Sequence, residues 1–202
     1  MVSLYEKETM NPIFQHPRYL LKRQALALTG KFRFYDPNGT QVMFSEQKMF
    51  RLREDIRVYS DESKTQEVLS IKARQIIDFS AAYDVVDTAM NQKVGALRRK
   101  GLRSLLRDEW EILDANDRVI GLLFEDSIGL ALLRRLVLGS WLPQNYDMTF
   151  GETRVGDLRQ NFNLLRYELN LDFSMDVSRL LDRRLGIAAG ILLAAVEGKE
   201  SS

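Results

Sequence analysis

The stretch "RRLGIAAGILLAAVEGKE", residues 183–200, decides how the rest of the chain is interpreted. Within it, the twelve residues 185–196 carry no polar side chain. A helix of that length covers about 18 Å at ~1.5 Å per residue, whereas the hydrocarbon core of a bilayer is about 30 Å thick. Charged residues flank the run, and each costs about 2.5 to 3.5 kcal/mol at the bilayer centre. The run is therefore too short to span a membrane.

The same run has no polar face. A helix that lies on a surface keeps one, whereas a helix that is apolar all round is enclosed by protein. We therefore predict a helix that forms the centre of the fold, through Leu185, Gly186, Ala189, Gly190, Leu192 and Leu193. We expect Asp176 or Ser178 to cap its start and Gly198 to end it. Arg183 and Arg184 are expected at the mouth of whatever encloses the helix.

Upstream of this helix, a short alternating pattern that closes on aspartate recurs along the chain. Alternation of apolar and polar residues is typical of a strand with one buried face. Turn-forming residues and a second alternating run follow each copy, as in a β-hairpin. The copies are "FRFYD" (32–36), "IRVYSD" (56–61), "YDVVD" (83–87) and "WEILD" (110–114).

Further strands are expected in residues 145–163 and 164–174, which brings the count to ten to twelve. A meander of this number closes into a barrel or packs as two sheets, because open edges invite aggregation. We predict a mainly β fold of the α+β class, in which an antiparallel meander forms a barrel of roughly twelve strands around the terminal helix. One short helix is expected near 127–138.

Composition favours one intracellular domain. The chain has 202 residues, no cysteine, and nearly equal numbers of basic (29) and acidic (28) residues. No overall field therefore attracts nucleic acid, and disulfides and thiolate metal sites are excluded. The first residues lack the apolar centre of a secretory signal. We expect an extension (1–15), a single domain (16–198), a short tail (199–202) and a cytoplasmic location.

Four segments carry a family resemblance: "HPRYLLKRQALALTGKFRFYDPNGTQVMFSEQK" (16–48), "YDVVDTAMNQKVGALRRKG" (83–101), "WEILDANDRVIGLLFED" (110–126) and "LDFSMDVSRLLDRRLGIAAGILLAAVEGK" (171–199). They resemble the LURP-one-related family, which is similar to phospholipid scramblases and to the tubby C-terminal domain. The resemblance covers about residues 16–198 and implies a twelve-stranded barrel closed around a hydrophobic C-terminal helix.

The resemblance also bears on function. Tubby-type domains bind phosphoinositides through basic side chains, and scramblases are linked to lipid movement and calcium. Scramblases also carry a proline-rich N-terminal region and a cysteine cluster, whereas this chain has four prolines and no cysteine. Lipid scrambling is therefore not expected.

A basic cluster is the strongest candidate for a binding site. It lies in "KVGALRRKGLRSLLR" (93–107), which holds no acidic residue. Phosphate groups would be attracted there, although a solvated hairpin edge would explain the same residues. The candidate lipid-binding residues are Lys93, Arg98, Arg99, Lys100, Arg103 and Arg107.

No catalytic motif, cofactor site or metal site is predicted. The sole histidine, His16, precedes a proline, and Walker, HExxH and GxSxG patterns are missing. Residues 172–183 match a calcium loop weakly, without its glycine and glutamate. The leading hypothesis is a non-enzymatic module that attaches reversibly to anionic lipid headgroups of a membrane surface, with a protein-interaction scaffold as the alternative. A ligand carrier or enzyme is less favoured, because the helix would fill the barrel.

Overall fold

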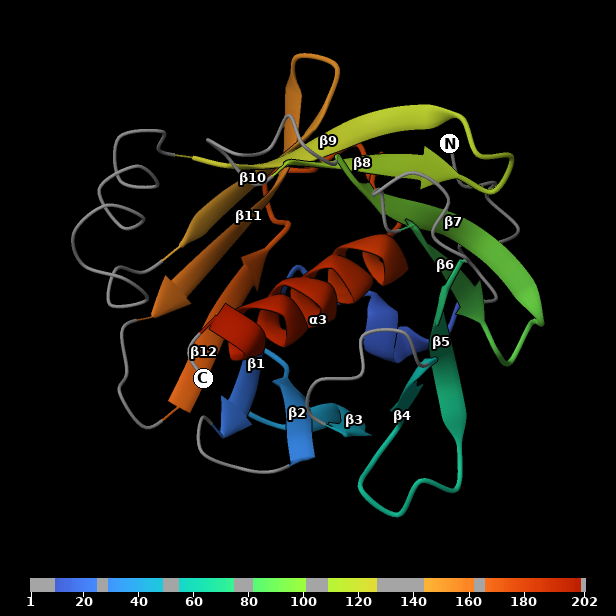
Figure 1. Ribbon diagram of the computed structural model, residues 1–202, viewed down its shortest axis with the longest axis vertical. Helices are drawn as coiled ribbons and strands as arrows, with labels where there is room; N and C mark the ends of the chain where they lie inside the picture. Colours follow the sequence, from blue (N-terminus) through green and yellow to red (C-terminus); the bar gives the residue numbers. More distant parts are fainter. Residues whose placement is uncertain are drawn as a thin grey trace.

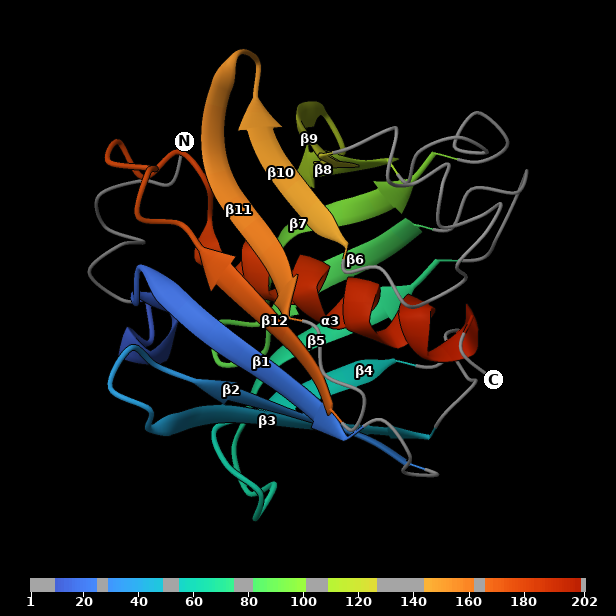
Figure 2. The same ribbon diagram turned by 90° about the vertical axis from the view of Figure 1, so that its left-hand side faces the viewer.

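Twelve antiparallel strands form a closed barrel around one long helix. The computed structural model describes residues 10–24, 29–48, 55–74, 82–100, 109–126, 144–161 and 166–200. The helix α3 (Arg183–Glu200) runs through the barrel, and a 3-10 turn, η1 (Pro12–Phe14), precedes the first strand (Figures 1 and 2). The strands are β1 (Arg18–Gln24), β2 (Thr29–Tyr35), β3 (Gln41–Lys48), β4 (Ile56–Tyr59), β5 (Glu67–Ala73), β6 (Ala82–Asp87), β7 (Gln92–Arg99), β8 (Glu109–Asp114), β9 (Val119–Glu125), β10 (Asn145–Phe150), β11 (Thr153–Asn161) and β12 (Arg166–Asp172).

Each strand pairs with its neighbours in the chain, and β1 closes the barrel against β12. The closing register places Arg18 opposite Asp172, and their side chains form an ion pair at 2.9 Å. This confirms the predicted meander and its closure. The repeat-based prediction covered β2 to β12 but did not separate β1, whose inward residues Tyr19 and Leu21 are buried.

The alternating sequence places one face of each strand against the helix. In β6, for example, Tyr83 and Val85 are buried while the intervening Asp84 is only partly covered. On the helix, every residue from Arg184 to Ala194 is buried. The run that has no polar face is thus enclosed from Leu185 to Ala194, as predicted. Within the described residues, no helix combines the length and apolarity that a membrane crossing requires.

Glycines allow the barrel wall to approach the helix closely. A Cβ on Gly186 would lie 2.5 Å from the ring of Phe173, and one on Gly190 would lie 2.8 Å from Leu171. Both partners belong to β12 or the residue that follows it. The two glycines, four residues apart, therefore serve contact between helix and strand, and the closer approach is at Gly186, where a side chain would overlap the Phe173 ring.

The aspartates of the repeated pattern hold turns. Asp36 accepts backbone hydrogen bonds from Asn38 and Thr40 at 2.9 and 2.8 Å. Asp114 does the same for Asn116 and Arg118, both at 2.9 Å. Side chains of this kind satisfy amides that the turn leaves unpaired. The turn interpretation of these residues is confirmed.

All described hairpin turns lie at one end of the barrel, because consecutive strands alternate in direction. We call this the turn end; it holds residues 36–40, 60–66, 88–91, 115–118 and 151–152. The helix begins at this end, where β12 finishes. The far end is the one at which β1 ends at Gln24 and β7 ends at Arg99.

Two details of the helix prediction, its N-terminal cap and its end, are wrong. Asp182, rather than Asp176 or Ser178, caps the start, since its carboxylate accepts the Arg184 amide at 3.0 Å. The helix continues past Gly198 to Glu200. Arg183 and Arg184 do begin the helix, but their side chains are only 12% and 5% exposed. The helix expected near 127–138 lies outside the described residues.

Candidate functional site

The described residues of the predicted basic cluster are divided between the two ends of β7. Lys93 is the second residue of the strand, whereas Arg98 and Arg99 end it. At about 3.3 Å per residue, the two ends are roughly 20 Å apart. Lys100 follows β7 directly, and Arg103 and Arg107 lie outside the described residues. The structure therefore groups residues 98–100 at the far end and separates Lys93 from them.

Lys93 belongs to an ion-pair network on the outside of the barrel. Its ammonium lies 3.1 Å from Asp84 and 2.8 Å from Asp117. Arg74 contacts the same two carboxylates at 2.5 Å. Hydrogen bonds from Lys93 and Arg74 lower the pKa of Asp117. Each charge of this network is thus met by two opposite charges, which favours a structural role for Lys93.

At the far end, the cations of β7 face carboxylates of β8. Arg98 pairs with Glu111 at 2.5 Å, and Lys100 pairs with Glu109 at the same distance. The register predicts this contact, because Arg98 lies opposite Glu111. The side chains of Arg98 and Lys100 remain 41% and 36% exposed. Exposed pairs of this kind contribute about 0 to 1 kcal/mol each, so these cations stay accessible to other anions.

The turn end has the opposite character. Its five described turns contain five carboxylates but only two cations, Lys64 and Arg118: the carboxylates are Asp36, Asp61, Glu62, Asp117 and Glu152. Turn chemistry explains the acids, because aspartate bonds to local amides. The five described hairpin turns therefore carry a net negative charge.

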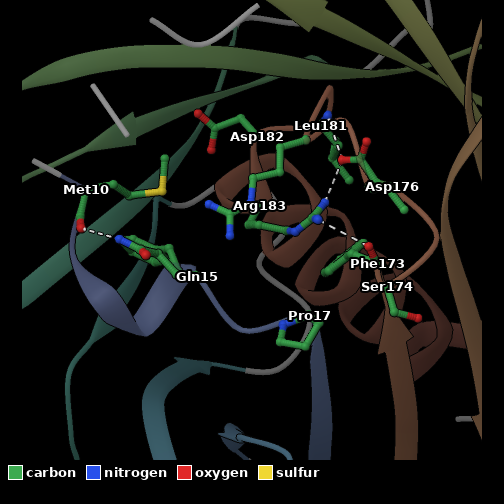
Figure 3. A pocket seen from close by; sticks show the side chains of 12 residues that line it. Met10, Gln15, Pro17, Phe173, Ser174, Asp176, Leu181, Asp182 and Arg183 are labelled. Carbon is green, nitrogen blue, oxygen red and sulfur yellow. Dashed lines mark hydrogen bonds and ion pairs between the residues drawn. The ribbon is translucent and has the colours of Figure 1, made fainter. Parts of the chain in front are cut away.

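A pocket of about 360 Å³ opens at the turn end, beside the start of α3. Two segments far apart in the sequence line it, 10–17 and 173–183 (Figure 3). We call it the mouth pocket. A backbone hydrogen bond of 2.8 Å from the Phe173 amide to the Pro17 carbonyl joins the two segments. Pro17 and Val177 give the pocket exposed apolar surface, and the nearly buried side chains of Phe14, Phe173 and Leu181 lie beneath it.

Asp176 organises the loop on one side of the mouth pocket. Its carboxylate accepts the amides of Leu180 and Leu181 at 2.8 and 3.0 Å. It also accepts a hydrogen bond of 2.8 Å from the guanidinium of Arg183. Arg183 donates in addition to the Phe173 carbonyl at 3.1 Å and lies over the Phe173 ring, as Figure 3 shows. Both oxygens of the buried Asp176 carboxylate thus accept hydrogen bonds from neighbouring residues of the chain.

Behind the pocket, Arg184 is buried between two aspartates. It binds Asp182 through two nitrogens, at 2.9 and 2.6 Å, and Asp87 at 2.7 Å. Burial alone would lower the pKa of Arg184, but hydrogen bonds with Asp182 and Asp87 raise it. This contact ties the first turn of α3 to the end of β6, and it removes Arg184 from any surface patch.

Arg179 is the exposed cation of the mouth pocket. Among the described residues it has no acidic partner, in contrast to Arg183. Its backbone adopts a left-handed conformation, with φ of 50°. Val177 lies two residues earlier on the same loop and is 88% exposed. The pocket therefore offers apolar surface and one available positive charge.

Sequence reasoning assigned residues 172–183 a weak calcium match and did not foresee a pocket. The carboxylates involved are occupied by internal donors: Asp172 by Arg18 and Ser174, and Asp176 by the groups described above. Within the described ranges, no group of three or more histidine or acidic side chains is placed to hold a metal ion. His16 lies in the segment 10–17, and its backbone amide donates a hydrogen bond of 3.2 Å to the Tyr19 hydroxyl.

A closed antiparallel barrel of twelve strands around a hydrophobic helix defines the structural class of this protein. The model of the LURP-one-related family matches residues 42–194. The chain belongs to the LURP-one-related family. No curated protein and no solved structure matches it.

Proposed function

We propose that this protein is a non-enzymatic module that docks reversibly on membranes by binding anionic lipid headgroups, such as phosphoinositides. The binding surface is the part of the basic cluster at the far end, residues 98–100. In the sequence, Arg103 and Arg107 extend it. Lys93 is not part of this surface, because its charge is satisfied in the network with Asp84 and Asp117.

The run of three cations at the end of β7, opposite the acidic hairpin turns, carries this proposal. An anionic membrane repels the carboxylates of the turn end, so a membrane approaches the barrel elsewhere. At the far end, three cations follow one another in the sequence at the end of β7. The resemblance to tubby-type domains, which bind phosphoinositides through basic side chains, supports the same class of ligand.

A lipid phosphate group would replace Glu111 and Glu109 as the partner of Arg98 and Lys100. Their partners, Glu111 and Glu109, each carry a single charge, and their side chains are 18% and 31% exposed. A phosphate monoester carries about two charges at neutral pH and binds arginine through two parallel hydrogen bonds. Near an anionic membrane, each basic residue contributes about 1 kcal/mol. Phosphate therefore competes successfully for these two cations.

The test is co-sedimentation with vesicles of phosphatidylcholine, with and without a phosphoinositide. We expect binding only to the phosphoinositide vesicles, and weaker binding as salt is raised. Replacing Arg98 and Lys100 together by glutamate should weaken binding about 30-fold, since two contributions of about 1 kcal/mol are lost.

A matched control replaces Lys64 and Arg118 by glutamate, which changes the net charge equally at the turn end. This control should bind like the wild type. If the two double variants lost vesicle binding equally, the effect would be due to net charge and not to the far end. Binding of the wild type to pure phosphatidylcholine vesicles would contradict recognition of the anionic headgroup. A separate variant, Arg103→Glu with Arg107→Glu, measures the contribution of the adjoining sequence.

A further inference from the structure

The mouth pocket has the composition of a site for an amphipathic molecule. Its accessible apolar surface comes from the exposed residues Pro17 and Val177, while Phe14, Phe173 and Leu181 lie almost fully buried beneath it. Cavities of a few hundred Å³ that combine apolar walls with a few polar groups are the usual form of small-molecule sites. The pocket lies outside the barrel lumen that α3 fills, so the central helix does not exclude a ligand there.

The charged groups of the pocket select for an anion. Asp176 accepts three hydrogen bonds from its own loop and from Arg183. Asp182 accepts the amide of Arg184 and two hydrogen bonds from its guanidinium. A cationic ligand would therefore meet no available carboxylate. An anionic ligand meets Arg179, the lining cation that has no acidic partner among the described residues.

The loop holds Arg179 in an unfavourable, left-handed backbone conformation. A left-handed backbone is unfavourable for a residue with a side chain. Asp176 enforces this conformation, because its carboxylate binds the two amides that follow Arg179. The Arg179 amide also donates to the Asp176 carbonyl at 3.0 Å. The cation is therefore presented by a fixed backbone.

From this geometry we propose that the mouth pocket binds a single-chain amphiphile with an anionic head. The alkyl chain lies against Pro17 and Val177, and a carboxylate or phosphate head pairs with Arg179. A volume of about 360 Å³ equals that of about a dozen water molecules, which accommodates one alkyl chain of medium length. This site is independent of the lipid surface proposed at the far end.

Isothermal titration calorimetry below the critical micelle concentration tests the ligand class. Decanoate and decyl phosphate should bind, and the tighter of the two identifies the preferred head group. Decyltrimethylammonium, with the same chain and the opposite charge, should bind at least about tenfold more weakly. Acetate and inorganic phosphate, which lack the chain, should also bind at least about tenfold more weakly, because they bury no apolar surface.

Two variants test the location. Arg179→Gln should weaken decanoate binding about tenfold and leave decanol binding unchanged, because only the charged head is affected. Arg118→Gln is the matched control: Arg118 is an exposed residue of the turn end whose side chain also has no acidic partner among the described residues. Both positions are on the surface, so neither change affects folding.

Amide chemical shifts recorded by NMR complete the test. Decanoate should move the signals of residues 10–17 and 173–183. Equal binding of decanoate and decyltrimethylammonium, an unchanged affinity in Arg179→Gln, or shifts confined to other parts of the barrel would each overturn the proposal.

Discussion

Replacing Gly186 by alanine should destabilise the barrel, although alanine is the better helix former. The new Cβ would lie 2.5 and 2.7 Å from two ring carbons of Phe173, whereas carbon atoms in contact are about 3.5 to 4.0 Å apart. The ring has little space to retreat. A Cβ built on Gly156 would meet the same ring at 3.0 Å, so Phe173 is held between two glycines.

The magnitude follows from two opposing contributions. Overpacking a core costs about 1 to 3 kcal/mol, and the confinement of Phe173 places this site near the upper value. Alanine in place of glycine within a helix contributes about 1 kcal/mol of stability. The net loss in the free energy of unfolding is about 2 kcal/mol. For a domain of this size, the melting temperature falls by about 4 to 8 °C.

Gly190→Ala is the matched control, one helical turn further along. There the new Cβ would meet Leu171 Cδ2 at 2.8 Å, while the other Leu171 carbons lie at 3.5 and 3.6 Å. A leucine methyl group rotates away easily, so this variant should stay within about 1 kcal/mol of the wild type.

Urea unfolding followed by circular dichroism measures both variants. Phe173→Leu in the Gly186→Ala background should restore part of the loss, which a double-mutant cycle detects as coupling. Gly186→Ala at or above wild-type stability would refute the packing of Phe173 against the helix.

Two further predictions concern the helix and the ion-pair network. Ala189→Glu should leave the chain unfolded, because Ala189 is buried and an unpaired carboxylate there costs several kcal/mol. The control, Ala195→Glu, changes a half-buried position of the same helix and should fold. Near-UV circular dichroism distinguishes the folded variant from the unfolded one. Asp117→Asn should lower stability at pH 7, and this loss should shrink as the pH falls below about 3.9. The pKa of Asp117 is lowered in the folded state, so its contribution is present above its ordinary pKa and is lost as the pH falls through the folded-state value. Asparagine tolerates the left-handed backbone at this position, where φ is 64°. A difference in urea midpoint that stays constant from pH 7 to pH 2 would contradict this role.

The sequence allowed the architecture to be predicted because its strongest signals are local. The run 185–196 has no polar face, and this property alone requires enclosure by protein. Alternation followed by turn residues is likewise contained within each hairpin. The aspartates that close the pattern, such as Asp36 and Asp114, form hydrogen bonds within four residues of themselves.

The site could not be predicted in the same way, because it depends on contacts between distant segments. The mouth pocket joins residues 10–17 to 173–183, which meet only when β1 pairs with β12. Proximity in the sequence was misleading for the basic cluster, since an extended strand separates Lys93 from Arg99. One signal was available: aligning "ALRRK" against "EWEIL" as neighbouring strands places Arg98 opposite Glu111.

The order of elements has a consequence for the synthesis of the protein. The helix that fills the barrel follows all twelve strands in the chain, and β1 closes the barrel only with β12. While a ribosome is still making β12, the completed hairpins have no partner for their apolar faces. Pairing between such distant strands is slow, and exposed strand faces favour aggregation. Nascent chains of this protein are therefore expected to depend on chaperones until α3 has emerged from the ribosome.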